Sequence, residues 1–470
     1  MKKVIIIILA AVLALTIGFA GSSCKAAGTA ETTVAAETTA AAATTAAAET
    51  AAAATTAAAE TAAPGSIVLK FTDFQGGNDA ILKSYGQLKE IFIKAHPEVK
   101  DIEYTQYTVT TYNEFLKPAI SGGTAPDLMA VYPGLDVAEV VDSGALRNLK
   151  PDIDNEWKSW LGPAYDFKGM SYKDGIYVVC QDVWTECIWY HKDMLKEIGW
   201  EIPASTEAFT AEDYAAMVAP AKAKGYDVMS AGFIETWCYY DSFFNFVHQQ
   251  QPADVPDMVE DAFAGKISWQ QPIFKNAMEV FVKLNDAQVW QKDALNMDYQ
   301  VQAFGDWLER KSIFLWGQGD WFAGSMKPEE NNKDNPNIGI TQYPLVNAQS
   351  EVAFNKNFGT DIGVYSKGQN QDLAVQWIRL TNSPEAAKIF MTNGVNPASG
   401  VVVNDLPEIT NPVLEECIKL YNSPGKYSEV YYFYADGVKA LGDGIGNVVL
   451  GVDTIDNVLK GLDEVSGFKG

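Results

Sequence analysis

From Ser66 onward, short apolar runs alternate with longer segments in which apolar residues recur at helical spacing. "SIVLKFTDF" predicts a strand, and "AILKSYGQLKEIFIKAHP" predicts a helix that ends before Pro97. "DIEYTQYTV", "TYNEFLKPAI" and "SGGTAPDLMAVYPG" continue as strand, helix and strand. Repeated units of this kind predict an α/β fold with a parallel sheet covered by helices on both faces. In such sheets, ligands bind in loops beyond the carboxyl ends of the strands.

The chain opens with Met1-Lys2-Lys3, an apolar run from Val4 to about Ala20, and small residues before Cys24. This pattern predicts a secretory signal over residues 1–23; an uncleaved membrane anchor is the alternative, because the run is close to the lower limit for a span. The segment resembles the signals of bacterial lipoproteins, whose last residue is a lipid-modified cysteine. The resemblance implies lipidation of Cys24 and attachment to the outer face of the cytoplasmic membrane, although Gly21 stands where that family usually has leucine.

Residues 24–65 consist almost entirely of Ala, Thr and Glu, and "TTAAAETA" at 44–51 recurs at 55–62. With no large apolar side chain beyond Val34, this tract cannot form a core. It predicts a semi-flexible stalk that holds a folded part away from a membrane surface.

About 400 residues remain, enough for two packed domains. The net charge of -25 offers no basic face for phosphates, which argues against a nucleic-acid partner. The three histidines, His96, His191 and His248, are widely spaced and form no ligand motif, so we expect neither a metal nor a cofactor.

Five cysteines are present. If Cys24 carries lipid, Cys180, Cys187, Cys238 and Cys417 remain; they could form two disulfides or stay as buried thiols, and the sequence does not reveal a pairing. On one extended segment, Cys180 and Cys187 would lie roughly 23 Å apart, too far to bridge without a turn.

Five segments follow one another along the chain: "SGGTAPDLMAV", "DSGALRNL", "GIYVVCQDVWTECIWYHKDMLKEIGWEIPAS", "RKSIFLWGQGDW" and "DLAVQWIRLTNSPEAAKIF". In this order they resemble the extracellular solute-binding proteins of sugar ABC importers, the maltose-binding-protein-like family. The resemblance implies two discontinuous α/β lobes of the periplasmic-binding-protein type II kind, joined by crossover hinge strands and closing on a sugar. It also implies crossings near 179–183, near 317–322 and just after Leu380. Lobe 1 would then comprise 66–180 and 323–380, and lobe 2 would comprise 181–322 and 381–470.

Sugars are bound by aromatic rings that stack on the pyranose face and by polar side chains that bind its hydroxyls. "FLWGQGDW" (314–321) contains both kinds of group, and its Gly-x-Gly lacks the lysine of a nucleotide loop. The family pattern implies that Trp321 lies in the cleft, whereas Phe314 and Trp316 lie on a buried strand. For any single tryptophan, core packing is the competing interpretation.

Other candidates come from spacing and position. Glu235 and Trp237 lie two residues apart, so on an extended segment they would point the same way, and Asp182 and Trp184 flank the first crossing with the same spacing. Tyr432 belongs to a late aromatic cluster that would close the pocket or pack the second lobe. The candidate ligand contacts are Gln75, Asn78, Tyr132, Asp136, Asp182, Trp184, Glu235, Trp237, Asp320, Trp321 and Tyr432.

The resemblance implies a monomeric extracytoplasmic receptor that captures a neutral sugar or oligosaccharide and delivers it to the membrane subunits of an ABC permease. A secreted carbohydrate-active enzyme is one alternative, with Glu235 and either Asp182 or Asp320 as its acid pair. A receptor for a polyamine or another non-sugar solute is a second alternative. Anionic ligands are less favoured, because the three arginines fall in segments predicted to be surface turns or helices.

Overall fold

The computed structural model describes residues 63–398 except 134, 203, 253, 254, 256 and 328, then 409–421, 426–428 and 434–470. The chain divides into two units, Met1–Ala59 and Glu60–Gly470, and the described residues belong to the second. The predicted signal, the lipidation site Cys24, nearly all of the stalk and Tyr432 lie outside the described residues. Within the described ranges, no helix has the length and apolar character needed to cross a membrane.

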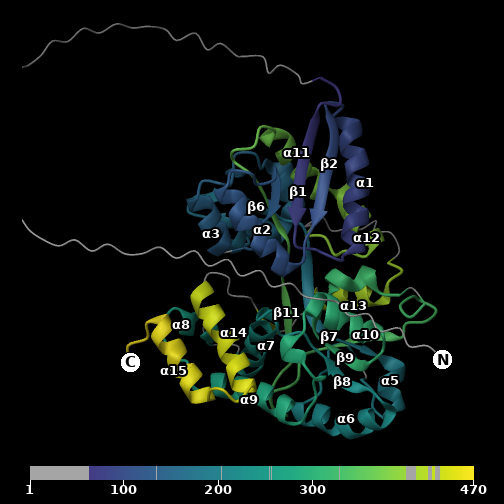
Figure 1. Cartoon of the computed structure of the whole chain (residues 1–470), viewed down its shortest axis with the longest axis vertical. Helices are drawn as coiled ribbons and strands as arrows, with labels where there is room; N and C mark the ends of the chain where they lie inside the picture. The colour runs from purple at the N-terminus through teal and green to yellow at the C-terminus, as the bar shows by residue number, and fades with distance from the viewer. Residues whose placement is uncertain are drawn as a thin grey trace, which may run out of the picture. The chain divides into compact units, whose positions relative to one another are not determined.

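The first lobe, at the top of Figure 1, is built on a five-stranded sheet in the order β2, β1, β3, β12, β6. Its strands are β1 (Ile67–Asp73), β2 (Val99–Gln106), β3 (Leu128–Ala130), β6 (Val178–Cys180) and β12 (Asp361–Val364). β1 runs parallel to β2 and β3, whereas β12 runs antiparallel to β3 and β6. The carboxyl ends of β1, β2 and β3 therefore meet at one edge of the sheet.

Helices cover this sheet because each presents an apolar face to it. In α1, the buried residues Ile81, Tyr85, Leu88 and Phe92 recur every three or four positions. Asn78 caps this helix, accepting a hydrogen bond from the Ile81 amide at 3.2 Å. The helices of the lobe are α1 (Asp79–Ala95), α2 (Val109–Ser121), α3 (Leu135–Asp142), α4 (Asn155–Leu161), α11 (Gln371–Thr381) and α12 (Pro384–Asn393), beside a small hairpin of β4 (Ser171–Tyr172) and β5 (Gly175–Ile176).

The second lobe is organised around one central strand, β7 (Val183–His191). On one side β7 pairs antiparallel with β9, and on the other side it pairs antiparallel with both β11 and β10. The remaining strands are β8 (Asp227–Ser230), β9 (Ser312–Gly319), β10 (Ile338–Thr341), β11 (Ala353–Phe358) and β13 (Lys426–Ser428). All nine residues of β7 except Trp184 are buried, as expected for a strand covered on both faces.

The helices of the second lobe surround this sheet (Figure 1). They are α5 (Lys192–Glu197), α6 (Ala211–Lys224), α7 (Trp237–Gln250), α8 (Met258–Phe263), α9 (Pro272–Asp286), α10 (Phe304–Leu308), α13 (Pro412–Tyr421), α14 (Ala435–Val449) and α15 (Ile455–Ser466). A π-helical turn (Tyr299–Ala303) precedes α10, and a 3-10 helix (Asp320–Ser325) follows β9. The mixed α/β fold with two sheet-containing lobes confirms the predicted fold class.

The chain passes between the lobes at positions that differ in part from those predicted. The first passage, at Gln181 and Asp182 between β6 and β7, falls where the sequence placed it. The second was expected near 317–322 but lies at Gly359 and Thr360, because β10 and β11 both pair with β7. Residues 338–358 therefore belong to the second lobe. Pairing between strands so distant in sequence is not encoded in local spacing.

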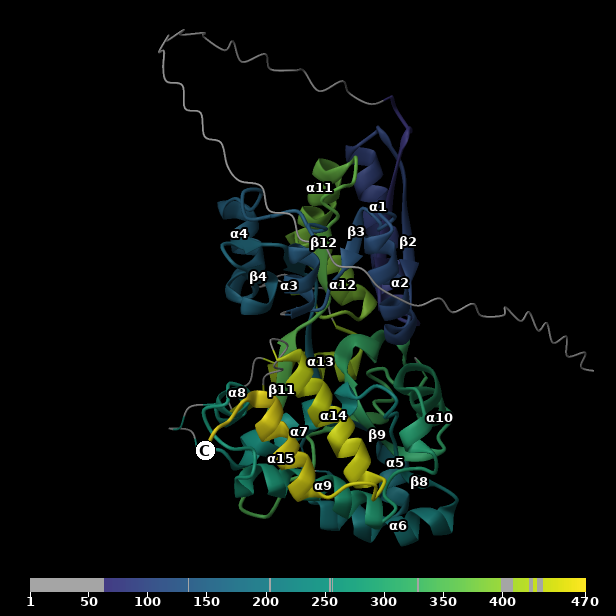
Figure 2. The same cartoon turned by 60° about the vertical axis from the view of Figure 1, so that its left-hand side comes forward.

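The third passage also lies later than expected. It was placed just after Leu380, yet α12 still packs on α1, with the Phe390 and Tyr85 ring centroids 5.6 Å apart. Figures 1 and 2 both show α11 and α12 beside the upper sheet and α13 to α15 beside the lower one. The last described residue before this passage with a side chain in the core of the first lobe is Ala398.

The segment "FLWGQGDW" divides between core and cavity. Phe314 and Trp316 are buried in β9, whereas Trp321 is only partly buried. A Cβ added at Gly319 would overlap the indole ring of Trp321, so glycine at this position lets the ring lie against the backbone. Packing of an aromatic ring thus explains Gly319, the second glycine of the Gly-x-Gly.

The four cysteines of the described residues are buried free thiols, which decides against disulfides between them. His191 is buried in the second lobe, where its ring stacks on Trp307 with centroids 4.4 Å apart. Its Nε2 lies 3.0 Å from the Trp307 carbonyl oxygen, in keeping with a structural role.

We predict that Phe314→Ala lowers the free energy of unfolding by about 3–5 kcal/mol, because it removes a fully buried ring packed against Tyr190 and Tyr214. Val301→Ala, at a side chain that is 66% exposed, is the control and should change stability by less than about 0.5 kcal/mol. Urea unfolding measures both. Equal effects of the two substitutions would contradict the assignment of Phe314 to the core.

Candidate functional site

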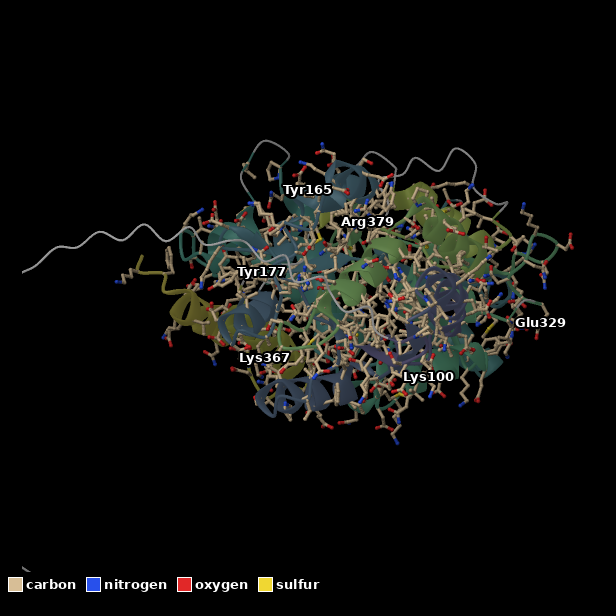
Figure 3. All side chains as sticks on the ribbon, turned by 90° about the horizontal axis from the view of Figure 1, so that it is seen from above. Lys100, Tyr165, Tyr177, Glu329, Lys367 and Arg379 are labelled. Carbon is tan, nitrogen blue, oxygen red and sulfur yellow. The ribbon has the colours of Figure 1, made fainter. Side chains whose placement is uncertain are left out.

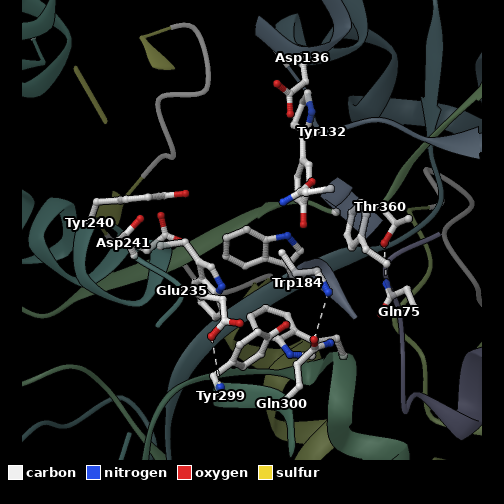
Figure 4. Close-up of a pocket in the computed structure, with 18 of the residues that line it drawn as sticks. Gln75, Tyr132, Asp136, Trp184, Glu235, Tyr240, Asp241, Tyr299, Gln300 and Thr360 are labelled. Atoms are coloured by element: carbon white, nitrogen blue, oxygen red, sulfur yellow. Dashed lines mark hydrogen bonds between the residues drawn. The ribbon is translucent and has the colours of Figure 1, made fainter. Parts of the chain in front are cut away.

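A cavity of about 700 Å³ is lined by residues of both lobes at the passages between them (Figure 4). This volume is within the range of sites that hold a small ligand. The first lobe contributes Phe74, Gln75, Val109, Asn113, Glu114, Tyr132, Pro133 and Asp136. The second lobe contributes Trp184, Ile234, Glu235, Thr236, Trp237, Tyr240, Asp241, Tyr299, Gln300, Trp321, Phe322, Phe358, Val438 and Lys439, and the passages contribute Asp182, Gly359 and Thr360.

Three tryptophans form a continuous aromatic surface on the second lobe. Trp321 meets Trp184 edge to face with centroids 5.6 Å apart and meets Trp237 at 6.0 Å. Trp237 in turn contacts Tyr299 at 4.7 Å. Such edge-to-face packing fixes the ring orientations before any ligand binds. The wall therefore presents aromatic rings in fixed orientations, at steep angles to one another.

The first lobe contributes a second, smaller aromatic pair. The rings of Phe74 and Tyr132 stack with centroids 4.3 Å apart and an angle of 9° between their planes. Phe74 directly follows β1, and Tyr132 lies just beyond β3. Both side chains thus lie at the carboxyl edge of the parallel strands, where the connectivity of the fold concentrates binding groups.

A hydrogen-bonded polar group lies where the two passages meet. The Gln75 side-chain amide donates to Thr360 Oγ1 at 2.5 Å and to Asp182 Oδ2 at 3.2 Å. Gly359, which precedes Thr360, packs against the side chains of Asp182 and Trp184, and a Cβ there would come within 2.8 Å of the Trp184 ring. The first passage, the second passage and the loop after β1 are therefore held together at one wall of the cavity.

The carboxyl groups of the cavity are buried, and burial raises their pKa values. It raises the pKa of Asp182 to about 7, with the charge of Asp73 adding to the effect. It raises the pKa of Glu235 to about 7, with nearby Asp298 adding to it, and raises the pKa of Asp241 well above its ordinary value. The pKa of Asp136 is raised by the same cause. A carboxyl that loses water favours its neutral form.

Basic side chains are nearly absent from this lining. Of the described residues that line the cavity, Lys439 alone is basic, and its ammonium group pairs with Asp443. The arginines are engaged elsewhere: Arg379, labelled in Figure 3, pairs with Asp154 and Glu156. Arg147 pairs with Asp152 and Asp372, and Arg310 pairs with Asp193 and Glu330. An anionic ligand would find no bidentate partner among the described lining residues.

The family model of bacterial extracellular solute-binding proteins matches residues 78–388, more than half of the chain. The chain belongs to this family. The resemblance to solute-binding proteins predicted from the sequence is thus confirmed, and the family is extracellular by description. No curated protein sequence matches the chain.

Solved structures have the same fold as this solute-binding protein. A structure reported for xylan utilization by the thermophilic bacterium Caldanaerobius polysaccharolyticus has a TM-score of 0.71 at 15% identity, covering 85% of this chain and 99% of that chain. A chitin oligosaccharide binding protein has a TM-score of 0.68 at 18% identity, covering 85% and 98%. The GacH receptor of Streptomyces glaucescens has a TM-score of 0.69 at 19% identity, covering 86% and 99%.

The structure brings together most of the residues that the sequence singled out. Eight of them line the cavity: Gln75, Tyr132, Asp136, Asp182, Trp184, Glu235, Trp237 and Trp321. That they contact a ligand stays a prediction. The local reason predicted for one pair was wrong, because Glu235 and Trp237 do not share an extended segment: Thr236 has helical dihedrals and α7 begins at Trp237.

Two other candidates lie behind the lining and make structural contacts. Besides capping α1, Asn78 donates from Nδ2 to the Trp321 carbonyl oxygen at 2.6 Å. Asp320 is 1% exposed and accepts hydrogen bonds from the Thr185 amide and from Asn396. Neither side chain lines the cavity in this structure.

Several lining residues were missed by the sequence analysis. Tyr240 and Asp241 lie three and four positions after Trp237, so a helical interpretation of "ETWCYYDSFF" would have placed all three on one face. Tyr299 and Gln300 belong to a π-helical turn, for which the local sequence carries no signal. Thr360 lies on the second passage, whose position depended on strand pairing.

The raised pKa of Asp182 predicts a pH-dependent stability. The folded protein keeps this proton up to about pH 7, whereas the unfolded chain keeps it only to the ordinary value of 3.8. Between these values the folded state binds more protons, so rising pH lowers the free energy of unfolding by up to about 1.4 kcal/mol per pH unit from this group. Asp182→Asn should flatten that fall in urea titrations across this range, and unchanged slopes would contradict it.

Proposed function

We propose that this solute-binding protein captures a sugar or oligosaccharide between its lobes and delivers it to the membrane subunits of an ABC permease. The tryptophan wall of Trp184, Trp237 and Trp321 carries the proposal, because aromatic faces stack on the CH faces of pyranose rings. Gln75, Thr360 and the carboxyl groups of the cavity lie around this wall and would bind ring hydroxyls. The chitin oligosaccharide binding protein and a raffinose complex of the binding protein RafE share the fold.

The function is binding without turnover. The family and the structural neighbours are binding proteins, which supports this part of the proposal. The predicted lipid on Cys24 would hold the receptor at the outer face of the membrane, with the Ala/Thr/Glu stalk as a spacer. A monomer suffices for this role, since both walls of the cavity come from one chain.

Closure of the lobes is the mechanism that follows from a cavity with two walls. A ligand that contacts both lobes stabilises the form in which they meet and so shifts the population toward it. Contacts between the lobes are already present: Asn78 reaches the Trp321 carbonyl, and the Val109 amide donates to Gln300 Oε1 at 3.3 Å. These few hydrogen bonds are weak enough for ligand binding to decide the balance.

A ligand panel tests the proposal. We expect one class of mono- or oligosaccharide to raise the unfolding temperature saturably, with no breakdown products, because a ligand specific for the native state stabilises it. Trp321→Ala should lower the affinity for that sugar by about 10- to 100-fold through loss of stacking. Trp160→Ala, at a tryptophan of α4 that packs beneath Arg379, is the control and should leave affinity unchanged. Stabilisation by non-sugar solutes alone, or sugar breakdown, would overturn the proposal.

The substitution Asn78→Ser tests the closure of the two lobes. Serine keeps an oxygen that can cap α1 but lacks the amide that reaches Trp321, so the variant should favour the open form without unfolding the helix. We expect a larger radius of gyration without ligand in small-angle scattering and about 3- to 10-fold weaker binding. Scattering curves and affinities identical to those of the parent protein would contradict this mechanism.

A further inference from the structure

The charge balance of the cavity is the observation that the proposed function leaves unexplained. Five carboxyl groups line the cavity, contributed by Glu114, Asp136, Asp182, Glu235 and Asp241. Lys439 is the one basic residue in the described lining, and its side chain is 73% exposed and paired with Asp443. A neutral sugar would offer none of these carboxyl groups a cationic partner.

Two of these carboxyl groups each have an oxygen with no hydrogen-bond partner among the described residues. They are Oδ1 of Asp182 and Oδ1 of Asp241, and both residues are only 5% exposed. A buried polar atom left unpaired destabilises the protein, and more so when it is charged. Both residues line the cavity, so a ligand donor that reaches these oxygens would recover this loss.

The surroundings of both residues contain further buried carboxyl groups. Asp182 interacts electrostatically with three buried carboxyl groups behind it, those of Asp73, Asp320 and Asp361. Asp241 lies close to the buried Glu186, whose own oxygens accept from Tyr343 and Asn355. Asp182 and Asp241 therefore each lie among other buried carboxyl groups, and an ammonium group on the ligand would favour the ionised form of the carboxyl that it contacts.

The tryptophan wall fits the same ligand chemistry. An ammonium group within about 6 Å of a tryptophan face gains a cation–π attraction, which is strongest when the site is desolvated. The rings of Trp184, Trp237 and Trp321 offer faces for stacking, and the amides of Gln75, Asn113 and Gln300 offer groups for hydroxyls. A flexible polyamine would use the acids but not these sugar-binding features.

We propose that the ligand is a basic carbohydrate: an amino sugar, or an oligosaccharide of amino sugars, whose free ammonium group is bound by Asp241 or Asp182 while its ring stacks on the tryptophans. This inference rests on the proposed function, because it specifies which class of sugar the cavity takes. It replaces the neutral sugar expected from the sequence.

Matched oligosaccharides test it directly. Short oligomers of glucosamine carry free ammonium groups, and the same oligomers after N-acetylation are neutral. Titration calorimetry on the purified protein should show the glucosamine oligomers binding at least about tenfold more tightly. Tighter or equal binding of the acetylated oligomers would overturn the inference and leave the sugar-receptor function intact. Binding of spermidine with no binding of any sugar would overturn both.

Single substitutions test which carboxyl group binds the ammonium group of the ligand. Asp241→Asn and Asp182→Asn keep the side-chain shape but remove the carboxyl that would ionise beside a ligand ammonium group, so each should weaken glucosamine-oligomer binding by at least about tenfold and acetylated-oligomer binding by less than about threefold. Asp372→Asn, at a carboxylate of α11 that is 85% exposed, removes the same charge far from the cavity and should change neither. Equal losses for both oligomers would overturn the role of charge. If one variant fails to fold, the other and the comparison on the parent protein still decide.

Discussion

The two lobes share one nearly continuous extended segment, β6 followed by β7, and the placement of both sheets depends on it. In the first lobe β6 is an edge strand beside β12, whereas in the second lobe β7 is central, with partners on both sides. Because the same backbone serves both sheets, the residues between them, Gln181 and Asp182, lie at the junction. A cavity between the lobes and a buried carboxyl on its wall are consequences of this arrangement.

Burial of carboxyl groups is the second constraint. Asp182 and Asp241 lie where the lobes exclude water, and the free energy that this costs the folded protein is not returned by any basic side chain of the described cavity lining. Receptors commonly keep such groups because a ligand completes their hydrogen bonds. The tryptophans beside them are already fixed by their mutual packing, so ordering them on binding loses little entropy.

Local sequence predicts many of the strands and helices, but it does not predict how distant strands pair into sheets. Periodicity and the family pattern predict the strands and helices from Ser66 to Leu128, and they also predict the division of "FLWGQGDW" into buried core residues and a partly buried ring in the cavity. The later passages were misplaced, because membership of β10 and β11 in a sheet depends on pairing with β7. The spacing of Glu235 and Trp237 predicted an extended segment, whereas α7 begins at Trp237. Two residues are too few to distinguish the two-residue period of a strand from the 3.6-residue period of a helix.

By itself, the sequence determined the α/β class, the first passage between the lobes and eight residues that line the cavity, since strand ends and the family's aromatic positions are local features. Only the tertiary structure decided that Asp241 and Thr360 line the cavity and that Asn78 and Asp320 lie behind it. It also decided the charge balance of the site. Contacts between segments far apart in the chain determine which carboxyl groups are buried and which basic side chains lie outside the cavity.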